Sequence, residues 1–318
     1  MYPLPPYTYS GPIDHSLPIP WNLLNNKSVL LTGGSNGIGA ATVRKFTEAG
    51  AFVTFGDVDE VQGKELESEV NKSYAEGEEK CKFVKCDIKS WGDQVKLFEE
   101  ATSNEKGLDV VIANAGISRT SEDSLWELDD LSKPPVKPDL NIVETNVNGT
   151  LYTFKLATYH FRKQRIPGGC FIMTGSLITY IDSPANWEYT ASKYALRGLL
   201  HTVRRNSWEQ NIRIAYVAPC YIRSAIRTAD WETSLLEQNV PFGETEDVAA
   251  CFARVATDPE TNGHALMIVP RSVAPLGFKD TGLEDFEEEG FMKATQIAQL
   301  NVIKDRWLEG AGVQVYKK

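Results

Sequence analysis

From Lys27 onward, the chain alternates short apolar runs with longer stretches in which apolar residues recur at helical spacing. Several short runs are apolar almost throughout, as in Asp109-Val-Val-Ile-Ala113, which is typical of strands covered on both faces of a parallel sheet. We therefore predict seven strands, at 29–32, 52–56, 82–86, 109–113, 170–174, 213–217 and 265–269.

The stretches between these runs carry the helical period and predict helices at 38–48, 60–73, 91–102, 140–162, 188–209 and 246–256. Regular alternation of strands and helices predicts an α/β chain with a doubly wound Rossmann fold. In this fold a seven-stranded parallel sheet is flanked by helices. We expect it to form a single domain over residues 25–275.

Both ends of the chain, and one internal stretch, do not follow this alternation of strands and helices. Residues 1–24 interleave prolines with tyrosines, which predicts an extended arm lying on the body; the alternative is a disordered tail. Residues 119–139 are polar and rich in proline, so we expect a surface excursion. In the C-terminal extension, 276–318, apolar residues of 284–308 recur at roughly helical spacing and predict one or two amphipathic helices.

The overall charge limits the classes of partner. A formal net charge of -10 argues against a nucleic-acid partner or an anionic membrane surface, both of which require a basic face. No stretch reaches the roughly 18 apolar residues of a membrane span, and the first residues do not resemble a secretory signal. The 5 scattered cysteines indicate reduced thiols, so we expect a cytoplasmic protein.

A glycine-rich segment, Thr32-Gly-Gly-Ser-Asn-Gly-Ile-Gly39, follows the first predicted strand and opens the first predicted helix. In a dinucleotide cradle Gly33 would make the turn, Gly37 would let the backbone approach a pyrophosphate, and Gly39 would let the helix pack close to the sheet. The helix N-terminus would offer its free N–H groups to the phosphates. The alternative is a plain glycine turn. The cradle residues are Gly33, Ser35, Asn36, Gly37, Ile38 and Gly39.

Asp57 ends the second predicted strand, about 18 residues after Gly39. A carboxylate there can accept both ribose hydroxyls of an adenosine, with Val58 beside it, and would repel the additional phosphate of NADP. No Arg or Lys occupies positions 33–38 or directly follows Asp57. These features favour NAD; the alternative is a turn or capping aspartate.

Two further strand ends belong to the same predicted crevice, because ligands of open α/β sheets bind at the carboxyl ends of the strands. Asp87 and Ile88 follow the third strand, where Asp87 could bond the adenine amino group. Asn114, Ala115 and Gly116 follow the fourth strand, where the backbone could lie against the adenosine.

Taken with Asn146, Ser176 and Tyr189-x-x-x-Lys193 in this order and spacing, these motifs resemble the short-chain dehydrogenase/reductase family over roughly residues 25–270. The cradle and second strand are most similar to its NAD-using branch, which includes hydroxyprostaglandin dehydrogenases and fungal tailoring dehydrogenases of secondary metabolism. The resemblance implies that Pro219, Ile222 and Ser224 lie at the nicotinamide. It also implies a homodimer or homotetramer, with the helices carrying Asn146 and Tyr189 at the subunit interface.

The sequence departs from the family pattern at three places. One is mild: the usual Asn-Asn-Ala-Gly is Ala113-Asn-Ala-Gly here. The family often has two serines before the substrate pocket, whereas this chain has Thr174-Gly175-Ser176; the spacing to Tyr189 selects Ser176 as the functional one. The usual Pro-Gly after the sixth strand is Pro219-Cys220, which puts the local turn in doubt.

The four residues of this motif suit proton transfer at a carbinol oxygen. We expect Tyr189 to act as general acid/base, and Lys193, one helical turn further on, to favour its phenolate and to hold the nicotinamide ribose. Ser176 would hydrogen-bond the reacting oxygen, and Asn146 would hold a water that passes the proton on. The alternatives are an exposed Tyr–Lys pair, a strand-end hydroxyl and a buried helix polar group.

The substrate pocket should be apolar and aromatic, which suggests a hydrophobic or aromatic secondary alcohol or ketone. Arg223 and Arg227 either meet a negative group on the substrate or are solvated loop charges, and we expect a mobile lid near 221–243. The histidines show no metal-ligand spacing, so no metal is expected. The predicted pocket residues are Leu177, Ile178, Tyr180, Trp187, Tyr221, Ile226 and Trp231.

The sequence therefore predicts an NAD-dependent oxidoreductase that interconverts such an alcohol and its ketone. One alternative is an NADPH-dependent ketoreductase with a similar substrate, against which Asp57 argues. The other is a non-catalytic nucleotide-binding regulatory protein, which would be expected to have lost at least one of the four catalytic groups.

Overall fold

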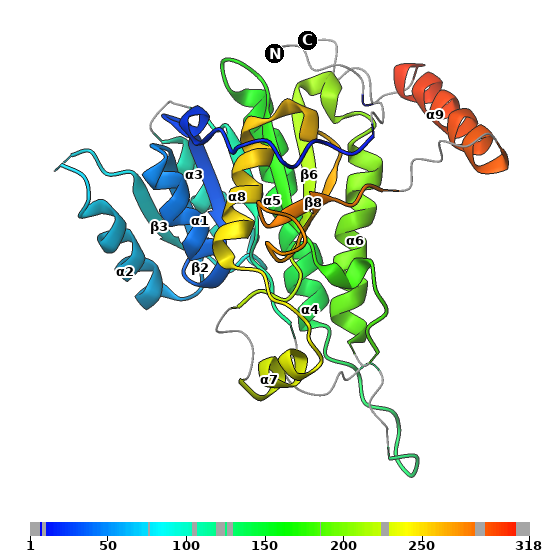
Figure 1. The fold of residues 1–318 in the computed structure, drawn as a ribbon. Helices are drawn as coiled ribbons and strands as arrows, with labels where there is room; N and C mark the ends of the chain where they lie inside the picture. Colours follow the sequence, from blue (N-terminus) through cyan, green and yellow to red (C-terminus); the bar gives the residue numbers. More distant parts are fainter. Residues whose placement is uncertain are drawn as a thin grey trace. The chain divides into compact units, whose positions relative to one another are not determined.

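The computed structural model describes residues 7, 11–75, 77–103, 107–118, 125, 130–184, 186–223, 229–283 and 290–309. The chain divides into two compact units, Met1–Thr281 and Gly282–Lys318. The first unit contains the sheet and the helices that cover it (Figure 1), and all site residues considered below belong to its sequence range.

The first unit is built on one sheet with the strand order β3-β2-β1-β4-β5-β6-β7-β8, and β1 to β7 are parallel. The Rossmann-type α/β class is confirmed. The seven strands predicted from the apolar runs all form, with ends within one or two residues of the prediction. They are β1 (Ser28–Thr32), β2 (Phe52–Asp57), β3 (Cys81–Lys85), β4 (Val110–Ala113), β5 (Gly169–Thr174), β6 (Ile212–Ala218) and β7 (Ala265–Ile268).

The predicted number of strands was wrong, because the sheet has an eighth strand. β8 (Phe278–Asp280) pairs antiparallel with β7 and covers its outer edge. Burial of Phe278, which is fully inside, anchors it. A strand of three residues is too short to show the alternation by which strands are found in a sequence.

Two layers of helices enclose the sheet (Figure 1). On one face α1 packs against α8, and on the other α3 packs against α5. The central strands β1, β4 and β5 therefore have both faces covered, and nearly all of their residues are buried. The helices of this unit are α1 (Gly37–Glu48), α2 (Glu60–Asn71), α3 (Trp91–Thr102), α4 (Asn141–Val143), α5 (Thr150–Lys163), α6 (Trp187–Val203), α7 (Ala229–Glu237) and α8 (Thr245–Thr257).

The helix predicted at 140–162 is not continuous. It begins as α4, widens into a π-helical segment over Glu144–Gly149 and continues as α5. At the end of the π segment Gly149 lies against Ile88, where a side chain on Gly149 would collide with the Ile88 Cδ1 atom, 2.6 Å away. Such a π segment changes the direction of the side chains it carries, and Asn146 is one of them. The helix predicted at 188–209 also ends early, at Val203, before a short 3₁₀ turn at Ser207–Gln210.

The N-terminal arm lies along the body where the structure describes it. The Tyr7 hydroxyl accepts a hydrogen bond of 2.8 Å from Arg204, whose guanidinium also stacks on the Tyr7 ring. The backbone N–H of Ile13 donates to Asp280, and the same carboxylate oxygen lies 2.7 Å from His264 Nδ1. Arg254 donates to the carbonyl groups of Leu17 and Pro18. The arm thus joins α6, α8 and β8 through buried polar groups.

The second unit contains one described helix, α9 (Phe291–Glu309), within the predicted helical region. Residues 284–289 of that region lie outside the described residues. Phe291, Met292 and Ile297 are exposed on α9. In the described part of the chain, no helix is both long and apolar enough to cross a membrane.

Candidate active site

The strand ends that precede the predicted site residues lie at one edge of the sheet, because parallel strands end there together. Thr32, the last residue of β1, pairs with Gly56 of β2 and Ala113 of β4. Ala113 in turn pairs with Met173 of β5, next to Thr174, which pairs with Val217 of β6. Loops that are far apart in the sequence therefore begin side by side.

The glycine-rich segment has the backbone that its sequence predicts. Gly33 and Gly37 have φ values of +70° and +51°, a region that favours glycine. A Cβ at Gly33 would lie 2.7 Å from the Ala115 Cα atom, and one at Gly39 would overlap the carbonyl oxygen of Gly33. The loop is therefore closed tightly against β4, and only glycine fits at both places.

The beginning of α1 fits an anionic ligand. The N-cap residue Asn36 makes no side-chain hydrogen bond to the first turn in the described structure, whereas Asp59 and Ser90 do cap α2 and α3. The first N–H groups of α1 thus lack the usual side-chain acceptor, and the helix dipole places a partial positive charge there. These features fit the pyrophosphate of a dinucleotide lying over Gly37.

Asp57 ends β2 and holds the cradle from the side. Its carboxylate accepts hydrogen bonds from the backbone N–H groups of Ser35, at 2.9 Å, and Asp59, at 3.1 Å. Ser35 is buried, and its hydroxyl donates to the carbonyl group of Asp59. Val58 is 63% exposed, so it can contact a ligand at this edge. Ile38 packs on the core beneath the segment.

Asn114 connects three strand ends. Its amide group donates to the carbonyl oxygen of Gly33 at 2.9 Å, and its oxygen accepts from the Thr174 hydroxyl at 3.2 Å. The Thr32 hydroxyl accepts from the backbone N–H groups of both Asn114 and Ala115. No sequence pattern marks the side chains of Thr32 and Thr174 as functional, because a single threonine at the end of a strand is common.

The loop after β3 is fixed by a residue that the sequence analysis missed. Gln94 of α3 is fully buried, and its amide group donates to the carbonyl groups of Ile88 and Gly149. Its oxygen accepts from the Thr153 hydroxyl at 2.7 Å. Gln94 thereby ties the Asp87–Ile88 loop to the π segment that carries Asn146. No pattern around Gln94 marks it, since its partners are distant in the sequence.

Lys193 is buried beneath the site on α6. Its ammonium group donates to the carbonyl oxygen of Thr174 at 2.9 Å and lies 5.6 Å from the centre of the Tyr189 ring. Burial lowers the pKa of Lys193 to about 8, because the charged form loses its hydration. A negative charge near this ammonium, such as a phenolate at Tyr189, would therefore be strongly favoured.

Asn146 is also buried, and it meets the same centre. Its two amide protons go to the carbonyl oxygen of Ile117, at 2.9 Å, and to the Ser192 hydroxyl, at 3.0 Å. Its side-chain oxygen accepts from the backbone N–H of Ile117. Ser192 donates in turn to the carbonyl oxygen of Tyr189. The Asn146 side chain is thus largely engaged in holding other residues, so a water there would bind as a donor.

Gly116 marks the point where these groups converge. A Cβ at this position would lie 3.1 Å from Asn146 Oδ1 and 3.5 Å from Lys193 Nζ. The absence of a side chain leaves room for a ligand to approach both groups.

Ser176 follows β5 and caps a short 3₁₀ turn, Leu177–Thr179. Its hydroxyl accepts a long hydrogen bond of 3.3 Å from Ile178, and its own N–H donates to the Tyr216 hydroxyl. The Ser176 hydroxyl proton is thus not used by this cap and can be donated to a ligand.

The predicted substrate residues divide into two groups. Leu177 and Tyr180 pack against Met267, Val269 and Ala274, and Ile178 is buried, so these three contribute at least partly to the core. Trp187 is 36% exposed, and the Tyr221 ring lies 6.1 Å from that of Phe242. These two aromatic residues remain the better candidates for contact with a substrate.

The predicted lid is described only in part. Ser224, Ile226 and Arg227 lie outside the described residues, and so does the side chain of Trp231, although its backbone belongs to α7. Arg223 pairs with Glu232 at 3.4 Å and with Glu244 at 3.1 Å, so its charge already has partners.

The base of this lid is joined to the body. Ile222 is buried and forms a β-bridge with Gly243. The Pro219 carbonyl oxygen accepts from the N–H of Leu177, which links the turn after β6 to that after β5.

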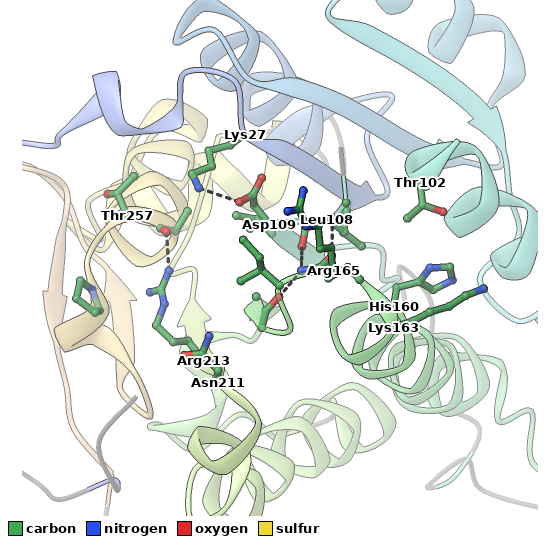
Figure 2. Close-up of a pocket in the computed structure, with 18 residues that line it drawn as sticks. Lys27, Thr102, Leu108, Asp109, His160, Lys163, Arg165, Asn211, Arg213 and Thr257 are labelled. Atoms are coloured by element: carbon green, nitrogen blue, oxygen red, sulfur yellow. Dashed lines mark hydrogen bonds and ion pairs between the residues drawn. The ribbon is translucent and has the colours of Figure 1, made fainter. Parts of the chain in front are cut away.

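A cavity of about 910 Å³ lies at the opposite, amino edge of the sheet (Figure 2). Among the residues around it, Lys27 pairs with Asp109 at 2.8 Å, and Arg213 donates to the carbonyl groups at the C-terminal end of α8. Both cations are therefore already engaged, Lys27 in a partly exposed ion pair and Arg213 at the C-terminal end of a helix. We therefore place the candidate site at the carboxyl edge.

Among the described residues no cluster of His, Cys, Asp and Glu could hold a metal ion.

The sequence is similar to those of several known dehydrogenases. A family model described as short chain dehydrogenase matches residues 27–234. A 5'-hydroxyaverantin dehydrogenase of Dothistroma septosporum is 28% identical over 274 residues, which cover 80% of this chain and 87% of that protein. An NADP-dependent dehydrogenase of a Phoma species is 29% identical, with coverage of 86% and 81%. A 3alpha-hydroxysteroid dehydrogenase of Mediterraneibacter gnavus is 28% identical, with coverage of 74% and 92%.

The fold also matches solved structures. A short chain dehydrogenase from Burkholderia cenocepacia, solved in complex with NADP, superposes with a TM-score of 0.65 at 24% identity, covering 77% of this chain and 96% of that one. This likeness concerns the arrangement of strands and helices.

Gly39 lies so close to the Gly33 carbonyl oxygen that a side chain at this position should disturb the cradle. We expect Gly39→Ala to weaken dinucleotide binding at least tenfold, because the new methyl group would push the loop away from α1. Fluorescence titration with NADH and NADPH measures the loss. Gly92→Ala in α3 is the control, since a Cβ there meets nothing within 4 Å. Equal affinities in the Gly39→Ala variant and the unmodified protein would contradict the assignment of the cradle.

Proposed function

Because the chain belongs to the short-chain dehydrogenase family, we propose that it interconverts a hydrophobic or aromatic secondary alcohol and its ketone with NAD as the cofactor. The observation that carries this proposal is the position of Tyr189 beside the buried ammonium of Lys193, at the sheet edge where the glycine cradle lies.

The nicotinamide, when bound, supplies or accepts the hydride, and the chain must move a proton on the substrate oxygen. We assign this proton transfer to Tyr189. A tyrosine has an ordinary pKa of ~10, so its phenol ionises near neutral pH only when the phenolate is stabilised. Lys193 provides this stabilisation through its charge. Ser176 would donate its hydroxyl proton to the same substrate oxygen and stabilise negative charge as it develops. Asn146 and Ser192 would keep α6 in place through the carbonyl group of Tyr189.

The preference for NAD rests on Asp57. Its carboxylate lies at the end of β2 beside the cradle, where it can accept the ribose hydroxyls and would repel the phosphate of NADP. The alternative is an NADPH-dependent ketoreductase. It is supported by the relative from a Phoma species, which is named as an NADP-dependent dehydrogenase.

For the cofactor, we expect the unmodified protein to bind NADH more tightly than NADPH in a fluorescence titration. Asp57→Asn should reduce this preference at least tenfold, because the repulsion of the phosphate is removed. Asp109→Asn, at the opposite edge of the sheet, is the matched control. A preference of the unmodified protein for NADPH would overturn the argument from Asp57.

For catalysis, we expect Tyr189→Phe to lower the turnover of secondary alcohols by about 10²-fold or more, with nucleotide binding retained, because only the transferable proton is lost. Tyr194→Phe is the matched control, since Tyr194 lies on the same helix and is 46% exposed. Full turnover in the Tyr189→Phe variant would exclude Tyr189 as the acid/base. Nucleotide binding without turnover in the unmodified protein would instead favour the non-catalytic alternative.

The proposed substrate class is supported by two aromatic residues near the site, the exposed Trp187 and the half-buried Tyr221, and by the pocket residues named above. Names of relatives point the same way, since two of them are dehydrogenases of 5'-hydroxyaverantin and of a hydroxysteroid. Turnover with a panel of secondary alcohols of increasing size tests this point. Activity on small polar alcohols alone would contradict it.

We further propose a homodimer or homotetramer that uses α5 and α6. Leu151, Tyr152 and Tyr159 on α5 are each at least 36% exposed, so together they offer an apolar surface that a second copy could cover.

The oligomer can be tested by sedimentation velocity. We expect Leu151→Asp to shift the protein toward the mass of a single chain, because a carboxylate would be buried in the interface. Leu131→Asp is the control, since Leu131 is 97% exposed in a loop. If the unmodified protein sediments as a single chain, the proposed interface is wrong.

A further inference from the structure

A second tyrosine, Tyr216, lies directly beneath the catalytic loop. It belongs to β6, is fully buried, and its ring occupies the space beside Gly175. A Cβ added to Gly175 would overlap the Tyr216 ring and hydroxyl. The residue before Ser176 and the residue on the neighbouring strand are therefore complementary in size: one has no side chain because the other fills its place.

The Tyr216 hydroxyl connects two of the proposed catalytic residues. It accepts a hydrogen bond of 3.3 Å from the backbone N–H of Ser176 and donates to the carbonyl oxygen of Lys193, also at 3.3 Å. The Thr179 hydroxyl lies 3.2 Å away and itself donates to the Ser176 carbonyl oxygen. A single buried hydroxyl thus contacts both ends of the Ser176–Thr179 turn and the backbone of α6.

We infer that Tyr216 is a positioning residue, which sets the separation between Ser176 and the helix that carries Tyr189 and Lys193. The inference rests on the proposed function of Ser176, Tyr189 and Lys193. The Tyr216 hydroxyl is directed at backbone atoms, so it acts by holding the loop and the helix in place.

The chemistry of the site suits such a role. Burial raises the pKa of Tyr216 far above its ordinary value, and the nearby Tyr189 raises it further when ionised. Tyr216 therefore keeps its proton near neutral pH. Its hydrogen bond to the backbone carbonyl oxygen of Lys193 is then retained.

The loss of this hydroxyl should affect catalysis more than binding. The N–H of Ser176 would lose its acceptor, and the turn would be free to shift relative to α6. Because the Ser176 hydroxyl must meet the reacting oxygen in the transition state, we expect such a shift to lower kcat while KM changes little.

The test compares Tyr216→Phe with Tyr74→Phe. Both changes remove one phenol hydroxyl that bonds to backbone, and Tyr74 bonds to the carbonyl oxygen of Thr47 at 2.7 Å, at the far end of α1. We expect about a tenfold fall in kcat for Tyr216→Phe, with KM within about twofold, and no change for Tyr74→Phe.

Hydrogen–deuterium exchange supplies a measurement that needs no substrate. Peptides covering residues 175–180 should exchange faster in Tyr216→Phe than in the unmodified protein, and at the same rate in Tyr74→Phe. Unchanged exchange in this segment would overturn the inference. If the unmodified protein turns over no alcohol while the segment still loosens in the variant, the proposed function fails, and only the structural part of the inference, that Tyr216 holds the turn, is supported.

A second pair of variants tests the complementary sizes and covers the case that Tyr216→Phe does not fold. Gly175→Ala should lower Tm and kcat, because its methyl group would collide with the ring. Adding Gly175→Ala to Tyr216→Ala should cost little further Tm, since the methyl group enters the space that the ring has left. Additive losses of Tm in the double variant would contradict direct packing of the two residues.

Discussion

The proposed chemistry depends on a single constraint, the burial of the Lys193 ammonium group. Burial of an uncompensated charge costs free energy. Here the ammonium group is stabilised by a hydrogen bond to the carbonyl oxygen at the end of β5 and, more weakly, by the ring of Tyr189. The end of β5 is itself fixed through the bonds that join Thr174, Asn114 and Gly33. The lysine that would favour a phenolate is therefore held by the same strand end that carries Ser176, and the cradle closes against the next strand along.

Much of this arrangement could be predicted from the sequence, because the signals were local. The apolar runs located the seven parallel strands, and the spacing of glycines placed the tight loop between β1 and α1. The order of Asn146, Ser176, Tyr189 and Lys193 pointed to one site, and the structure brings Asn146, Lys193 and the Tyr189 backbone together through Ser192 and Gly116. The roles of these residues in catalysis remain predictions.

What the sequence did not show depends on contacts between distant residues. β8 is too short for a period, and it forms because Phe278 is buried against its neighbours. The π segment arises where Gly149 meets Ile88 and where Gln94 binds both of their carbonyl groups. The unusual Thr174-Gly175-Ser176 was recognised as a departure from the family pattern, but its reason, the ring of Tyr216, lies 41 positions further along the chain.

The docking of the N-terminal arm constrains the order in which parts of the protein can fold. Ile13 and Asp280 are separated by 267 positions, and Arg254 contacts carbonyl groups of the arm across more than 230 positions. The arm must therefore wait for partners that are synthesised more than 230 positions later. During this interval its apolar and aromatic residues are open to chaperones, and the edge of β7 is still uncovered. Docking of the arm and addition of β8 thus become linked steps, which can take place only after Asp280 has left the ribosome.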